Sequence, residues 1–79
     1  MNPNDAEKMM AQARAMQERL EEAIALWTRA EAMDRRLRPG TPGHLTLLED
    51  LASAKAMLGD EAGARALRDD AARLRQPKK

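Results

Sequence analysis

RPGTPG, at residues 38–43, divides the sequence into two stretches that are rich in helix-forming residues. Proline lacks a backbone N–H and disfavours helical geometry in the residue before it, so Pro39 predicts that a helix ends at Arg38. The hydroxyl of Thr41 can accept a hydrogen bond from a free N–H of a following helix, and Pro42 suits the first position of that helix. The stretch therefore predicts a loop between helical regions.

The residues before this loop predict helix along most of their length. No Pro and no Gly occurs from Ala6 to Leu37, and the segment is rich in Ala, Glu, Arg, Met and Leu, which are strong helix formers. Asn2 can act as an N-cap, Pro3 suits the first helical position, and Asp5 places an acidic charge in the first turn. These signals predict that helix begins at Pro3.

After the loop, a second helix is predicted to run to about Leu58 and a third to about Gln76. Gly59 is typical of the residue that ends a helix, and Asp60 is a suitable N-cap for the next one. Residues 77–79, Pro-Lys-Lys, are predicted to form a basic tail beyond the last helix, where cations are favoured.

Each predicted helix carries one apolar stripe at the alternating three- and four-residue spacing of an amphipathic helix. The stripes consist of Met9, Ala13, Met16, Leu20, Ala23, Trp27 and Ala30; of Leu47, Leu51, Ala54 and Leu58; and of Ala64, Leu67, Ala71 and Leu74. No segment shows the alternating pattern of a strand. The sequence therefore predicts a single all-α domain over residues 1–79.

The composition indicates a thin core. A chain of 79 residues buries a modest fraction of its surface, and Trp27 is its only aromatic residue. Because Ala contributes little burial energy, a single copy is expected to be marginally stable. We therefore expect this protein to need a partner.

Other counts exclude several classes of protein. The chain has no Cys, which excludes disulfides and thiol chemistry. Its 14 basic and 13 acidic residues leave a net charge of +1, which argues against a nucleic-acid partner. Neither a signal peptide nor an apolar run of the ~20 residues that span a bilayer is recognisable. These features predict a cytoplasmic protein with no membrane partner.

A repeated pattern links the two halves. Its first copy comprises Ala23, Leu26, Ala30 and Met33, and its second, 41 residues later, comprises Ala64, Leu67, Ala71 and Leu74. This pattern resembles the tetratricopeptide repeat (TPR) family, in which two antiparallel helices form each unit. The second half matches the family at Leu51-Ala52, Ala54, Gly59-Asp60, Ala64 and Ala71, and the first half at Met10-Ala11, Ala13, Ala23 and Ala30.

The resemblance implies TPR-like units at about 4–37 and 45–78, separated by the loop at 38–43, with a spacing similar to that of kinesin light chains. The first unit departs from the family at its expected turn, Gln17-Glu18-Arg19-Leu20, which has no Gly or Asp. Two interpretations therefore remain. The repeat favours two hairpins and four helices, which we prefer. The alternative is one helix over residues 3–38 and three helices in total. That helix would be about 50 Å long at 1.5 Å per residue, and it would require a second subunit to cover it.

No residue pattern in the chain indicates catalysis. His44 is the only histidine, and without a second His or a Cys we expect an exposed residue at the start of the middle helix. Ser53 has no paired base in its helix and is expected to serve close packing. Phosphate-loop, nucleotide-binding and metal-ligand spacings are also absent from the sequence. We therefore predict that the protein is not an enzyme and has no catalytic residue, cofactor or metal ion.

The resemblance implies a peptide groove lined by the first helix of each unit. Carried onto this chain, its protein-binding residues include Lys8, Gln12, Met16, Ser53 and Met57. Trp27, with Met9, Met16 and Leu20, is expected to form an apolar docking surface, and Leu47, Leu51 and Leu58 to lie in a shared core. The function predicted is that of an adaptor that binds a protein or peptide and forms a homodimer.

Two alternatives to the adaptor remain. The chain could be a purely structural or engineered helical assembly unit whose partner is itself. It could also be a small nucleic-acid-binding regulator, in which Arg35, Arg36 and Arg38 contact phosphates together with Arg73, Arg75, Lys78 and Lys79.

Overall fold

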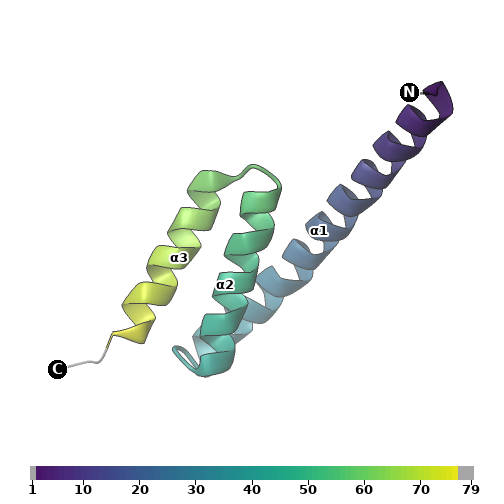
Figure 1. Ribbon diagram of the computed structural model, residues 1–79. Coiled ribbons are helices and arrows are strands. Elements are labelled where there is room, and N and C mark those ends of the chain that lie inside the picture. The colour runs from purple at the N-terminus through teal and green to yellow at the C-terminus, as the bar shows by residue number, and fades with distance from the viewer. Residues whose placement is uncertain (1, 77–79) are drawn as a thin grey trace.

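The computed structural model describes residues 2–76 and contains, within them, three helices and no strand (Figure 1). They are α1 (Pro3–Leu37), α2 (Pro42–Met57) and α3 (Glu61–Arg75). The all-α prediction is confirmed, and each helix end lies within a residue or two of its predicted position. The predicted basic tail, residues 77–79, lies outside the described residues, as does Met1.

The capping residues are those that the sequence predicted. The side chains of Asn2, Thr41 and Asp60 accept hydrogen bonds from a backbone N–H two or three residues further on, at 3.1, 3.2 and 2.9 Å. Gly40 and Gly59, in the two turns, have φ values of +75° and +90°. Only glycine adopts this geometry without steric penalty, so both turns depend on a glycine.

The four-helix prediction is wrong, and the long-helix alternative is confirmed. α1 is a single helix of 35 residues with no break at the expected turn. At 1.5 Å per residue it is about 52 Å long. Inside the expected turn, the side-chain amide of Gln17 donates to Glu21 one helical turn later, at 3.2 Å. Residues 17–20 contain no glycine to adopt a left-handed turn, so the helix continues through them.

The middle helix, α2, holds the other two together. α2 runs antiparallel to α1 and α3 runs antiparallel to α2, and only these neighbouring pairs pack along their backbones in residues 2–76. Figure 1 shows the N-terminal part of α1 extending well past the α2–α3 hairpin. The molecule is 62 Å long, and its radius of gyration of 16.3 Å exceeds the roughly 12 Å of a compact chain of this size.

The core is small, and its buried side chains belong to α2 and α3. Its fully buried apolar residues are Leu48, Leu51, Ala52, Ala54, Ala64 and Ala71. Leu51 was predicted there, whereas Leu47 and Leu58 are only half-buried and Leu48 was missed. The reason is that α2 packs against α1 on one side and α3 on the other, so a single stripe does not describe it. None of the α1 residues is fully buried.

Two glycines provide a test of this fold. Gly59→Ala should lower the free energy of unfolding by about 1–2 kcal/mol, because alanine is strained at a positive φ. Gly43→Ala is the matched control: Gly43 lies in the first turn of α2 and has open space around it. This substitution should instead raise the free energy of unfolding, by about 0.5 kcal/mol. Urea unfolding followed by circular dichroism measures both, and equal effects of the two substitutions would contradict the assigned turn.

Candidate functional site

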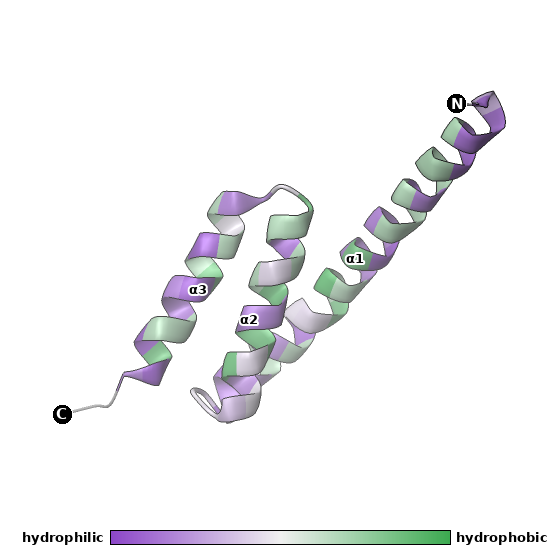
Figure 2. Ribbon diagram, viewed as in Figure 1, coloured by the Kyte–Doolittle hydropathy of each residue, from purple (hydrophilic) through white to green (hydrophobic). Residues whose placement is uncertain are grey.

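α2 covers only part of the apolar stripe of α1. The end of α2 reaches the level of Ala13 to Leu20, where Met57 and Leu58 face α1. At 3.6 residues per turn, Ala6 and Met9 continue the same stripe beyond that point. Figure 2 shows hydrophobic residues recurring along this protruding part of α1. We call Ala6, Met9, Ala13 and Met16 the free stripe; Met9 is 58% exposed and Met16 is 56% exposed.

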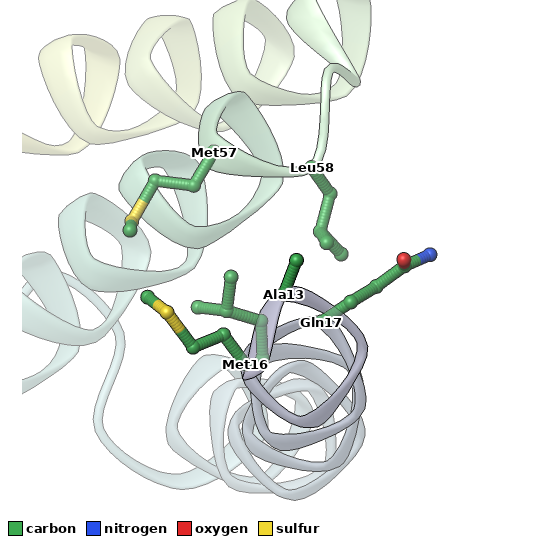
Figure 3. Close-up of a pocket in the computed structure, with 6 residues that line it drawn as sticks. Ala13, Met16, Gln17, Met57 and Leu58 are labelled. Atoms are coloured by element: carbon green, nitrogen blue, oxygen red, sulfur yellow. The ribbon is translucent and has the colours of Figure 1, made fainter. Parts of the chain in front are cut away.

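An open groove of about 400 Å³ lies where the free stripe meets the end of α2. It is lined by Ala13, Met16, Gln17 and Leu20 of α1 and by Met57 and Leu58 at the end of α2. In Figure 3 the Met16 and Met57 side chains lie on the same side of this groove, and Leu58 points toward α1. Met57 is 66% exposed. The groove is therefore an apolar, adaptable surface that is open to solvent.

Of the predicted protein-binding residues, the structure brings Met16 and Met57 together in the groove. Lys8 and Gln12 are exposed on the protruding part of α1, and Ser53 is exposed on α2. Trp27 is half-buried farther along α1 and does not line the groove. Sequence reasoning missed Gln17 as a lining residue, because its place there depends on where α2 ends relative to α1.

The second distinctive feature is a polar junction at the other end of α2. His44 is fully buried, so the prediction of an exposed helix-start residue is wrong. The backbone N–H of Gly40 donates to its Nδ1 at 3.0 Å, and its Nε2 lies 2.7 Å from Oε2 of Glu31. Because Nδ1 accepts a hydrogen bond, Nε2 carries the hydrogen and donates a hydrogen bond to the Glu31 carboxylate. The sequence did not reveal this, since Glu31 lies in the preceding helix and only the fold brings it to His44.

Arg35 extends this junction to the third helix. Its Nε donates to Oε2 of Glu31 at 3.0 Å, and its Nη2 donates to Oδ2 of Asp70 at 3.3 Å. We call Glu31, Arg35, Gly40, His44 and Asp70 the junction, because they connect α1, the loop, α2 and α3. Both nitrogens of His44 are engaged and the ring has no exposed surface, so it is not placed to act on a bound molecule. Its role in this structure is to support the fold.

The junction affects the acidity of one carboxyl. Burial raises the pKa of Glu31, but the hydrogen bonds from His44 and Arg35 and the positive charge of Arg35 outweigh it. The pKa of Glu31 therefore lies below its ordinary value of 4.5. The ionised carboxylate is the form that accepts both hydrogen bonds.

In residues 2–76, no three His, Asp or Glu side chains lie close enough together to hold a metal ion. No helix in the same range combines the length and hydropathy that crossing a membrane requires. No family model, curated protein or solved structure matches this chain. The resemblance to the TPR family therefore stays a prediction.

The junction predicts how stability depends on pH. Because folding lowers the pKa of Glu31, the stabilisation is complete above its ordinary value of 4.5 and is lost as the pH falls through the lowered value. The urea midpoint measured from pH 7 to pH 3 should show this loss in the wild type. Glu31→Gln should remove that contribution, and Glu18→Gln, which replaces an exposed carboxyl of α1, should preserve it. If Glu31→Gln lost stability in acid as steeply as the wild type, the junction would not be the cause.

Proposed function

We propose that this chain is a non-enzymatic, TPR-like protein-interaction module of the cytoplasm, whose groove accepts an amphipathic helix of a protein partner. The observation that carries the proposal is the free stripe, which begins at the end of α2, at Met16 and Ala13, and continues past it to Met9 and Ala6. A helical partner with its own apolar stripe would extend the packing that α2 begins.

The exposed area supports this proposal. The accessible surface is 6280 Å², whereas a compact monomer of 8.8 kDa exposes roughly 4800 Å². Isolated helices shorter than about 12–15 residues are marginal in water. The part of α1 that precedes Ala13 and the end of α2, residues 3–12, is shorter than this. Contact with a partner would bury the apolar side chains of this segment and stabilise its helical structure.

The chemistry of the groove indicates the kind of partner. Its lining is apolar apart from Gln17, and Arg19 lies at its edge. A helix that binds in such a groove makes contact through apolar residues spaced three and four apart. Methionine side chains suit this role because they are unbranched and adapt to different shapes.

The arginines of the nucleic-acid alternative are partly engaged within the protein. Arg35 pairs with Glu31 and Asp70, and Arg38 has a carboxylate of Asp34 at 3.8 Å. These ion pairs neutralise positive charge that would be needed to bind a phosphate group. We therefore favour a protein partner over a nucleic acid.

Methyl NMR of the labelled methionines tests the proposal. We expect an uncharged amphipathic helical peptide, or an increase in protein concentration, to shift the methyl signals of Met16 and Met57 and to leave that of Met33 unchanged. Met33 is a suitable internal control because it is 60% exposed and lies outside the groove. A peptide of the same composition in scrambled order should have a weaker effect.

The substitution Met57→Glu should abolish these shifts, because it places a charge in the groove, and Met33→Glu should leave them intact. If the signals of Met16 and Met57 respond neither to the peptide nor to protein concentration, the groove is not an interaction site and the proposal fails.

A further inference from the structure

We propose that α1 carries a second docking surface, which binds an acidic amphipathic helix of another protein. We call this surface the side stripe; it consists of Ala23, Leu26, Ala30, Met33 and Leu37. None of these residues lines the groove, so the inference goes beyond the function proposed above and does not depend on it. It is carried by the repeat that relates α1 to α3, by the exposure of the side stripe, and by the charges along its edge.

The repeat supplies an internal template for this surface. The order of small and large residues in the side stripe recurs in α3, 41 positions later, as Ala64, Leu67, Ala71 and Leu74. In α3 the two alanines are fully buried and the two leucines are half-buried. Within residues 2–76, α2 is the only helix that packs along α3. The pattern in α3 is therefore covered by a helix.

The same pattern in α1 has no such cover. Leu26 is 64% exposed and Met33 is 60% exposed, and Ala30 between them is exposed as well. The side stripe thus presents to solvent the arrangement of side chains that α3 buries against α2. Removing these apolar side chains from water would be favourable. By analogy with α3, the occupant that the repeat indicates is a helix.

A helix can lie on the side stripe without displacing α2 or α3. α2 lies on the side of α1 that carries Glu31, which contacts His44. At 3.6 residues per turn, the centre of the side stripe is about 120° around α1 from Glu31 and about 160° from Arg35, which reaches Asp70 of α3. The end of α2 meets α1 at residues 13–20, before the side stripe begins. The surface is therefore open along its length.

The charges beside the side stripe are mostly positive. Arg29 and Arg36 each follow a large residue of the stripe by three positions, so both lie along its edge. Both are exposed, and neither belongs to an ion pair formed within residues 2–76. Of the acids nearby, Asp34 already pairs with Arg38, which leaves Glu22 against two arginines. This edge favours a partner with acidic residues.

The template pair has the same sign of charge pairing. Arg75 of α3 forms an ion pair with Glu49 of α2, so the helix that carries the stripe supplies the base and the covering helix supplies the acid. A partner helix with apolar residues spaced three and four apart, and with Asp or Glu beside them, would repeat both features on α1. The opposite charges would also favour this partner over a basic one.

Binding of a designed peptide to the full chain tests the inference. The probe is a labelled helical peptide with leucine and alanine spaced three and four apart on one face and glutamate on its flanks. Its control carries lysine in place of every glutamate. By fluorescence anisotropy the glutamate peptide should bind about tenfold more tightly than the lysine peptide, and it should shift the methyl signal of Met33. The uncharged peptide used for the groove has no acidic flank, so it should leave Met33 unchanged.

Two substitutions locate the site. Leu26→Glu should weaken binding of the glutamate peptide about tenfold or more, because it places an unpaired charge in an apolar contact. Met10→Glu is the matched control, since Met10 is similarly exposed (58%) and lies outside the groove, the free stripe and the side stripe. Neither residue is buried, so circular dichroism should show that both variants keep the fold.

A charge reversal tests the edge of the stripe. Arg29→Glu combined with Arg36→Glu should weaken binding of the glutamate peptide about three- to tenfold and strengthen binding of the lysine peptide, because the signs of the flanking charges are exchanged. The preference of the wild type for glutamate should also decrease as salt is added, since these charges are exposed.

The outcomes separate this inference from the proposed function. A Met33 signal that responds to the glutamate peptide, together with loss of binding in Leu26→Glu, supports it whether or not the groove binds a helix. Equal binding of the two peptides, or binding that is indifferent to Leu26→Glu, would overturn it. A Met33 signal that moves with protein concentration alone would assign the side stripe to a second copy instead. Binding to anionic vesicles without binding to the glutamate peptide would assign it to a lipid surface, and either result would also overturn the proposal.

Discussion

The hydrogen bond between His44 and Glu31, 2.7 Å long, connects α1 to the start of α2 and fixes how the rest of the molecule is arranged. The Gly40 N–H holds the opposite side of the same ring, so the loop and both helices are aligned by one buried side chain. Replacing the His44 ring would remove a hydrogen-bond partner from the Gly40 N–H and from the Glu31 carboxylate. This loss should lower the free energy of unfolding. With α2 anchored there, its length alone determines where it ends along α1, and hence where the free stripe and the groove begin.

One set of residues forms the core, and another attaches α1 to the α2–α3 hairpin. Leu48, Leu51 and four alanines of α2 and α3 form the core, whereas α1 contributes side chains that are at most half-buried. The polar junction attaches α1 to the hairpin at one end, with Arg35 reaching Asp70 of α3. The other end of α1 carries much of its apolar surface into solvent. The apolar side chains of this end of α1 are therefore exposed without any disruption of the core.

Local signals predicted the helix ends well, since Asn2, Thr41, Asp60 and Gly59 act through bonds and dihedral angles within a few residues. Non-local features were predicted poorly. His44 was expected to be exposed because its partner, Glu31, belongs to the preceding helix, and Leu48 was missed because α2 is packed on two sides. The prediction of two helices in residues 4–37 followed the repeat, although the segment has no residue suited to a turn. Met16 and Met57 were assigned to binding, but the groove that joins them depends on the length of α2.

The separation of the core from the free stripe affects how this protein can change over evolutionary time. Met9 and Met16 are more than half exposed, so substitutions there remove little buried contact and change the exposed surface of α1 more than the stability of the fold. Residues such as Leu48 have no such freedom, because their neighbours are fixed on all sides. The exposed face of α1 is therefore free to vary in sequence while the interior of the α2–α3 hairpin stays the same.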